Sequence, residues 1–392
     1  IMKDTNVKRF SHKGENIVLV NNRIVDESVS HINKIDVDSE WINLNFEEEG
    51  DKTFDEMIGL LKGNELPVSA FIDRKSGIYP GGSTKFEKRD IAENVPCWNK
   101  ENCIQCNQCA FVCPHAVIKP YLLDKDDKYE NALPSMFPKD KKYAIGISYK
   151  DCTGCGLCAN ICPGKVGNKA LSMEKYDKGK FTNNDFEYLN EHRVSFDNAI
   201  LNVKNIGFRD PKFEYSGACA GCGETAYIKN LTQVFNDNLF IANATGCSSI
   251  YGASAPATPY SVPWANSLFE DNAEFGLGIK QGINIKRDKI KKYMEENKSP
   301  IFEKWLKNID DYKVCKEVYN EINFEEHPYL DGLRDYIVPK SMWIIGGDGF
   351  SYDICYGGLD HVLSTNEDMN ILILDTEVYS NTGGQSSKSS NI

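Results

Sequence analysis

Apolar and polar positions follow two different periods along the chain, and the clearest pattern lies toward the C-terminus. Residues 341–345 and 370–374 are short apolar runs that predict buried strands, and residues 352–363 between them predict a helix. Such a β-α-β unit is typical of a parallel sheet. The loops that follow the two strands, 346–350 and 375–385, are then expected at the edge where parallel sheets bind ligands, the first of them as a turn.

Other stretches carry weaker patterns. Apolar residues between 301 and 309 recur at helical spacing and predict an amphipathic helix, preceded by a more basic helix over 286–294. Near the start, residues 15–24 and 40–46 predict strands and residues 54–61 a short helix. No apolar run approaches the roughly 18 residues that a membrane span needs.

The composition narrows the class of protein. The chain has 392 residues with 57 acidic and 45 basic side chains, a net charge of −12, which argues against a nucleic-acid or anionic-membrane surface. Apolar residues make up 41%, so packed cores are expected, and the length suggests two or three domains. Because the sequence begins with Ile1 and stops soon after a glycine-rich loop, we expect a segment of something longer, and the lack of a signal peptide then says nothing.

Eight of the 14 cysteines form two copies of one spacing, C-x2-C-x2-C-x3-C-P. This spacing is typical of bacterial ferredoxins with two [4Fe-4S] clusters, in which the fourth cysteine of each run ligates the other cluster. We therefore expect one cluster on Cys103, Cys106, Cys109 and Cys162, and a second on Cys113, Cys152, Cys155 and Cys158.

Disulfides and zinc are the competing interpretations of these runs. Disulfides suit small secreted scaffolds, and zinc usually takes four ligands in well-separated pairs, so both fit a large acidic chain with locally bunched cysteines less well. The segment 119–150 between the runs is rich in Asp and Lys and predicts a solvated insertion.

Three more cysteines lie in segments of small residues. Cys219 and Cys222 form a C-x2-C pair, and Cys247 follows Gly246 in similar surroundings. Glycines let the backbone approach a bulky group. The pair alone fits zinc, a redox-active dithiol or a cluster equally.

The loops after the two C-terminal strands carry the second motif. Asp348 stands between two glycines on the first loop, and the second loop offers hydroxyl, carbonyl and amide oxygens. Hard oxygen ligands of this kind suit Mg²⁺, which commonly bridges to a diphosphate. The spacing from Gly347-Asp348-Gly349 to Asn381 is similar to the thiamine-diphosphate motif.

The two motifs together resemble the pyruvate:ferredoxin (flavodoxin) oxidoreductase family, also called pyruvate synthase. Further stretches carry the resemblance over nearly the whole chain, at residues 63–71, 86–89, 242–252, 266–275 and 375–385. It implies a C-terminal portion of such an enzyme. The fold it implies is α/β: the end of a preceding domain plus a small linker domain over 1–95, a ferredoxin-like two-cluster α+β domain over 96–205, and a thiamine-diphosphate-binding, doubly wound parallel-sheet domain over 206–392.

The resemblance also implies site residues. A third [4Fe-4S] cluster would be held by Cys219, Cys222 and Cys247, with a fourth cysteine that this chain does not contain. Mg²⁺ would take Asp348, the Thr376 hydroxyl and the Val378 carbonyl, and Glu224 and Asn381 would be catalytic. The implied thiamine-diphosphate contacts are Glu224, Cys247, Gly347, Asp348, Gly349, Phe350, Thr376, Glu377, Val378, Tyr379, Ser380 and Asn381.

The activity implied is oxidative decarboxylation of pyruvate to acetyl-CoA and CO₂, with single electrons passing through the clusters to ferredoxin or flavodoxin. The partners implied are pyruvate and CoA, bound largely by domains outside this chain, and a second copy in a homodimer, with no nucleic acid and no membrane. We expect the chain alone to be inactive, in an anaerobic cytoplasm or else a hydrogenosome-like organelle. Competing hypotheses are another 2-oxoacid as substrate, an NADP-linked relative, and a non-catalytic eight-iron electron-transfer subunit.

Overall fold

The structure, a computed structural model, describes residues 1–37, 53–77, 80–196, 201–253 and 257–391. The chain divides into two compact units, Ile1–Thr53 and Phe54–Ile392. None of the helices in the described ranges combines the length and the apolar character that a membrane crossing requires.

The first unit contains, in its described part, the helices α1 (Met2–Phe10) and α2 (Glu15–Ser28). The strand predicted over residues 15–24 is therefore wrong, and the one predicted over 40–46 lies outside the described residues. A helix satisfies its backbone hydrogen bonds locally, whereas a strand needs a partner strand. The apolar side chains of this stretch also fit helical spacing, at Ile17, Val20 and Ile24.

The second unit begins with α4 (Phe54–Gly59), close to the predicted helix, and continues into a cysteine-rich region. There β1 (Asn94–Trp98) pairs antiparallel with β5 (Leu171–Lys175). Between these strands lie two short helices, α5 (Gln108–Val112) and α6 (Leu157–Ile161). Each helix begins one residue before the third cysteine of its run and ends one residue before the fourth, so the two runs form two similar halves.

The segment between the runs is a structural part of this region. Strand β2 (Ile118–Asp124) pairs antiparallel with β4 (Lys141–Ile147), and β3 (Leu133–Pro134) pairs with the other edge of β4. Residues 121–123 and 143–145 are buried. The prediction of a solvated insertion over 119–150 is therefore wrong for the two long strands, because the charge runs mark only the exposed ends of an otherwise apolar pair. Helix α7 (Asn184–His192) packs against this sheet through Phe186 and Leu189.

The C-terminal half contains a four-stranded parallel sheet with the order β7-β6-β8-β9. The strands β8 (Ser341–Gly346) and β9 (Asn370–Ile373) confirm the predicted strands and their parallel pairing. They are joined in the sheet by β6 (Leu239–Ala244) and β7 (Trp264–Ser267).

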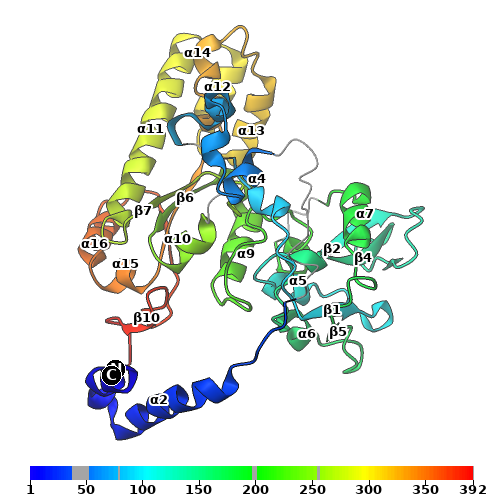
Figure 1. Cartoon of the computed structure of the whole chain (residues 1–392). Coiled ribbons are helices and arrows are strands. Elements are labelled where there is room, and N and C mark those ends of the chain that lie inside the picture. The colour runs from blue at the N-terminus through cyan, green and yellow to red at the C-terminus, as the bar shows by residue number, and fades with distance from the viewer. Residues whose placement is uncertain (38–52, 78–79, 197–200, 254–256, 392) are drawn as a thin grey trace. The chain divides into compact units, whose positions relative to one another are not determined.

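Helices cover both faces of the parallel sheet (Figure 1). On one face Ile344 packs with residues of α11 (Asn272–Glu296) and α16 (Tyr356–Ser364). On the other face Ile345 packs with residues of α9 (Thr225–Phe235) and α10 (Cys247–Gly252). Apolar strands buried on both sides are typical of a parallel α/β sheet.

The helix predicted over residues 352–363 is only partly confirmed. The structure has two helices, α15 (Asp348–Tyr352) and α16, separated at Asp353, where φ is −114° and ψ is −110°. Residues 346–350 were predicted as a turn, but Asp348 already begins α15, with Gly347 preceding it in an extended conformation. This short extra helix fixes the backbone around Asp348.

Beyond the sheet, α11 continues into a helical layer with α12 (Pro300–Lys307), α13 (Tyr312–Glu321) and α14 (Pro328–Asp331). The amphipathic helix predicted over 301–309 is confirmed by α12, whose Trp305 is fully buried. The basic helix predicted over 286–294 is a part of the longer α11. The remaining described elements are α8 (Val203–Ile206), β10 (Val378–Tyr379) and β11 (Gln385–Ser386), besides 3₁₀ helices, of which η4 (Val68–Gly77) is the longest.

We expect Trp305→Ala to lower the free energy of unfolding by about 3–5 kcal/mol, because it empties a closely packed site in this layer. The Trp305 side chain is completely buried and its Nε1 donates to the Ile337 carbonyl at 2.8 Å. Urea unfolding followed by circular dichroism measures the change. Tyr312→Ala, on a side chain that is 42% exposed, is the matched control and should stay within about 0.5 kcal/mol of wild type. Equal losses in both variants would contradict the packing described here.

Candidate functional site

The eight cysteines of the two runs separate into two sets around two different cavities. The first cysteine set consists of Cys103, Cys106, Cys109 and Cys162, next to Trp98 and Tyr143. The second cysteine set consists of Cys113, Cys152, Cys155 and Cys158. Each set thus takes three cysteines from one run and the last cysteine from the other. Among the residues that the structure describes, no three His, Cys, Asp or Glu side chains are grouped as ligands of a single metal ion, and cluster binding by the two sets stays a prediction.

The backbone around both sets is arranged in the same way. The Gln105 amide donates to the Cys103 sulfur, and the Gly154 amide donates to the Cys152 sulfur. Both distances are 3.4 Å, and the two bonds lie at equivalent places in the two runs. Asn107 and Gly156 precede the two short helices in the left-handed conformation, with φ of 60° and 76°. Hydrogen bonds to sulfur and burial are the means by which a protein adjusts the reduction potential of a bound iron–sulfur cluster.

Burial also changes the acidity of these thiols. It raises the pKa of Cys109 well above its ordinary value and that of Cys152 and Cys158 to about 12. A thiol must lose its proton to ligate a metal, so binding by these sets would release protons.

A third cysteine group faces a larger cavity of about 760 Å³. Cys219 and Cys222 reach it from the loop before α9, and Cys247 reaches it from the start of α10. Cys315 and Cys355, the two cysteines that follow these in the sequence, lie instead in buried apolar cores. The structure therefore brings together the three cysteines that the resemblance implies for a third cluster, and their ligand role stays a prediction.

The third cysteine group lies next to the second cysteine set. Gly221, between Cys219 and Cys222, has a φ of 74°, and a Cβ placed there would lie 3.4 Å from the Cβ of Cys155. His115, two residues after Cys113, is buried, and its two ring nitrogens lie 3.2 Å from the carbonyl oxygens of Ser216 and Cys219. The loop of the third group thus packs directly onto the cysteine-rich region.

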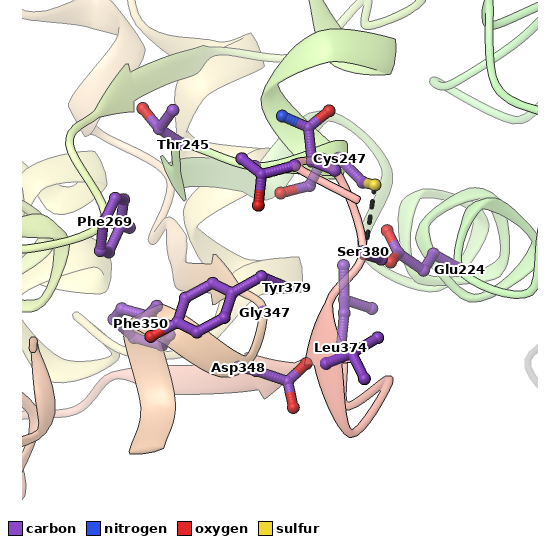
Figure 2. A pocket seen from close by; sticks show the side chains of 16 residues that line it. Glu224, Thr245, Cys247, Phe269, Gly347, Asp348, Phe350, Leu374, Tyr379 and Ser380 are labelled. Carbon is purple, nitrogen blue, oxygen red and sulfur yellow. Dashed lines mark hydrogen bonds between the residues drawn. The ribbon is translucent and has the colours of Figure 1, made fainter. Parts of the chain in front are cut away.

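A smaller cavity of about 100 Å³ lies at the carboxyl ends of β6, β8 and β9 (Figure 2). Ten of the twelve predicted thiamine-diphosphate contacts line it, which are Glu224, Cys247, Gly347, Asp348, Gly349, Phe350, Val378, Tyr379, Ser380 and Asn381. The Thr376 hydroxyl donates a hydrogen bond to Asp348, and Thr376 lines the larger cavity. Glu377 lines neither cavity, and its backbone has a φ of 62°. The small cavity is thus built almost entirely from segments that directly follow parallel strands.

Sequence reasoning missed the rest of the wall of the small cavity. Thr245, Gly246 and Ser248 follow β6, Phe269 follows β7, and Leu374 follows β9. The rule that ligands bind beyond the carboxyl ends of parallel strands could have found them, had β6 and β7 been recognised as strands of the same sheet. Thr382 completes the wall from the loop after β10.

Asp348 lies at the centre of a hydrogen-bonded group of oxygens. Its side chain accepts hydrogen bonds from the backbone amide and the hydroxyl of Thr376, at 3.1 and 3.0 Å, and from the hydroxyls of Ser387 and Ser389. The Thr376 hydroxyl is also 2.9 Å from the Val378 carbonyl oxygen. The three predicted Mg²⁺ ligands are therefore neighbours. Burial acts to raise the pKa of Asp348, but the four hydrogen bonds outweigh it and lower the pKa, so the carboxylate is ionised at neutral pH.

Glu224 has an unsatisfied oxygen in the same place. Its Oε2 is buried and has no hydrogen-bond partner among the described residues. Burial, and to a smaller extent the charge of Asp348, raises the pKa of Glu224, while the Tyr251 hydroxyl acts in the opposite direction. A buried carboxyl oxygen without a partner is costly, so this position fits a ligand that brings a hydrogen-bond donor.

One hydrogen bond joins the third cysteine group to the loop after β9. The Cys247 sulfur lies 3.3 Å from the Ser380 hydroxyl oxygen, drawn as the dashed line in Figure 2. Cys247, Ser380 and Asn381 line both cavities. The small cavity and the third cysteine group are therefore adjacent parts of one site.

Comparisons with known proteins agree with this arrangement. Residues 102–166 match the family described as a 4Fe-4S dicluster domain, and residues 54–92 match EKR, described as a domain of unknown function. The chain is 45% identical to a pyruvate:ferredoxin oxidoreductase of Moorella thermoacetica and 40% identical to a pyruvate-flavodoxin oxidoreductase of Klebsiella pneumoniae, in each case over 99% of this chain. It is also 41% identical to a pyruvate dehydrogenase [NADP(+)] of Cryptosporidium parvum over 85% of this chain.

The chain spans only a part of these relatives, 37%, 36% and 20% of their respective lengths. The similarity nevertheless extends through the cysteine-rich region, the third cysteine group and the parallel sheet. Over nearly all of its length the chain is therefore related to the pyruvate:ferredoxin and pyruvate-flavodoxin oxidoreductases, and its residues 102–166 match the 4Fe-4S dicluster domain family.

Proposed function

We propose that this chain supplies the electron-transfer and thiamine-diphosphate parts of an enzyme that oxidises pyruvate and CoA to acetyl-CoA and CO₂. In this proposal the two electrons leave singly through [4Fe-4S] clusters to a ferredoxin or a flavodoxin. In this proposal Mg²⁺ and a homodimer rest on the family resemblance, and a cytoplasmic location rests on the oxygen sensitivity of [4Fe-4S] clusters. The domain boundaries near residues 95 and 205 rest on the family resemblance as well.

The observation that carries the proposal is the continuity of three sites. The small cavity shares Glu224, Cys247 and Asn381 with the larger one, and the third cysteine group packs against the second cysteine set. Electrons released at the sheet edge would therefore have a short route to both sets. A relay of one-electron carriers next to a two-electron reaction is what such an enzyme needs.

The residues of the small cavity suit the proposed cofactor. Asp348, Thr376 and Val378 would hold Mg²⁺ through three oxygens, and Mg²⁺ commonly bridges protein carboxylates to phosphates. Glu224 would accept a hydrogen bond with its unpartnered oxygen, and Asn381 would orient the substrate from the loop after β10. Bound thiamine diphosphate supplies an electron sink for breaking the bond next to a 2-oxo carbon.

Two measurements on the anaerobically purified chain test the proposal together. Calorimetry should detect thiamine diphosphate binding that requires Mg²⁺. Stopped-flow absorbance should show the dithionite-reduced chain passing electrons to oxidised ferredoxin or flavodoxin, and much more slowly to NADP⁺. Electron transfer without thiamine binding would favour a non-catalytic electron-transfer subunit, and preferential reduction of NADP⁺ would favour an NADP-linked enzyme. Failure of both measurements would overturn the proposal.

A further inference from the structure

A buried lysine from the parallel-sheet region lies against the cysteine-rich region. Lys229 is on α9 and is only 2% exposed. Its ammonium group donates to the carbonyl oxygens of Ala110 and Phe111, the latter at 3.0 Å. Asn230 donates to the same Phe111 oxygen at 3.2 Å. Figure 1 shows α9 between the parallel sheet and α5.

The two carbonyls that bind Lys229 belong to α5, the helix that connects the two cysteine sets. Cys109 of the first set and Cys113 of the second set stand directly before and shortly after them. The ammonium group is therefore close to one cysteine of each set. The charges of Cys113 and, to a smaller extent, Cys109 act to raise the pKa of Lys229, against the larger lowering by burial to about 8.

In the part of the chain that the structure describes, no carboxylate pairs with this charge. Among the residues that the structure describes, Lys229 forms no ion pair, whereas its neighbour Lys119 is paired with Glu214. A buried charge needs a compensating charge of opposite sign. Carbonyl dipoles supply a part of it, and the thiolates that the two cysteine sets would present to bound clusters would supply the rest.

The second half of the cysteine-rich region has an equivalent lysine that is exposed. Lys169 donates to the carbonyl oxygens of Ala159 and Asn160 at 2.8 and 3.1 Å. These two residues follow Cys158 on α6 as Ala110 and Phe111 follow Cys109 on α5. The chain thus places an ammonium group on equivalent carbonyls twice. That of Lys169 is exposed to solvent, and that of Lys229 is buried. Charges in solvent are screened much more strongly than buried ones.

We propose that the buried ammonium group of Lys229 raises the reduction potential of the clusters held by the two cysteine sets, and that of the second set most. This inference rests on the proposed function. With four thiolates a [4Fe-4S] cluster is already anionic, and each cluster gains one further negative charge when it accepts one electron. A fixed positive charge nearby stabilises the reduced form. Since the second set lies next to the third cysteine group, a higher potential there would draw electrons from the site of oxidation.

The size of the effect follows from Coulomb's law. A unit charge about 10 Å from a cluster, in surroundings of effective dielectric constant about 20, changes the ratio of reduced to oxidised cluster by roughly tenfold. For a one-electron couple, a tenfold change is about 59 mV. The screened charge of Lys169 should change the ratio much less.

The test compares four variants by redox titration followed by electron paramagnetic resonance, after the iron of each has been counted. Lys229→Met removes charge and donors, Lys229→Gln removes the charge but keeps a donor, and Lys229→Arg keeps both. Lys169→Met is the matched control at the equivalent carbonyls. We expect both neutral variants at position 229 to lower the potential of at least one cluster by about 59 mV, with Lys229→Arg and Lys169→Met close to wild type.

Several results would overturn the inference. Unchanged potentials in iron-loaded Lys229→Met and Lys229→Gln would show that the charge has no influence. A shift in Lys229→Met alone would assign the effect to the lost hydrogen bonds, and an equal shift in Lys169→Met would remove the role of burial. Loss of iron from both neutral variants but not from Lys229→Arg would make the charge necessary for assembly instead of tuning. A wild-type chain without iron would overturn the proposed function as well.

Discussion

Replacing Cys113 by alanine is expected to remove one of two clusters and so to lower the iron content from about eight to about four atoms per chain. Cys113 belongs to the first run in sequence but lines the cavity of Cys152, Cys155 and Cys158. Its loss should therefore empty the second cysteine set and leave the first one loaded. Iron and acid-labile sulfide are measured after anaerobic purification. Cys97→Ala, at a cysteine outside both sets, is the control and should keep all of the iron.

Double variants show which cysteines act together. In the structure Cys113 and Cys152 share one set, so Cys113→Ala with Cys152→Ala should still hold about four irons. Cys103 and Cys113 belong to different sets, so Cys103→Ala with Cys113→Ala should hold almost none. If each run bound its own cluster, the two results would be exchanged. Such a result would contradict the arrangement in which the fourth cysteine of each run belongs to the set of the other run.

Replacing Asp348 by asparagine should weaken Mg²⁺-dependent binding of thiamine diphosphate by at least about 100-fold. Loss of a group that merely supports a metal ligand already costs about 10- to 100-fold in affinity, and Asp348 is the one carboxylate among the three predicted Mg²⁺ ligands. Asparagine has the same shape and can still accept the hydrogen bonds of Thr376, so the fold should be kept. Calorimetry measures the affinity, and circular dichroism melting checks the fold.

Asp360→Asn is the matched control for this substitution. Asp360 lies on α16 and is exposed, away from both cavities. The Asp360→Asn variant should bind thiamine diphosphate with the affinity of the wild type. Equal affinities for Asp348→Asn and wild type would show that Mg²⁺ is held elsewhere or not at all.

The site was more predictable than the fold because its signals are local. The spacing within each cysteine run fixes which residues can surround a cluster, and the glycines around Asp348 mark the end of a buried strand. Both signals need only a few neighbouring residues. The strands β8 and β9 were predictable for the same reason, since each is a short apolar run bounded by turn residues.

The wrong predictions involve longer-range information. The stretch 15–24 contains a short apolar run whose residues fit both a strand and a helix, and only the structure shows α2. The charge runs in 119–150 conceal two strands, because burial of Tyr121 and Tyr143 depends on pairing between β2 and β4. Phe269 and Lys229 could not be assigned to the site because their neighbours are distant in sequence.

The proposed function depends on two [4Fe-4S] clusters held next to the third cysteine group. The most direct measurement is iron and acid-labile sulfide per chain on anaerobically purified protein, with a paramagnetic resonance spectrum of the dithionite-reduced state. We expect about eight irons and eight sulfides, with signals from two interacting clusters. Zinc in place of iron, or iron without acid-labile sulfide, would contradict the binding of [4Fe-4S] clusters by this chain.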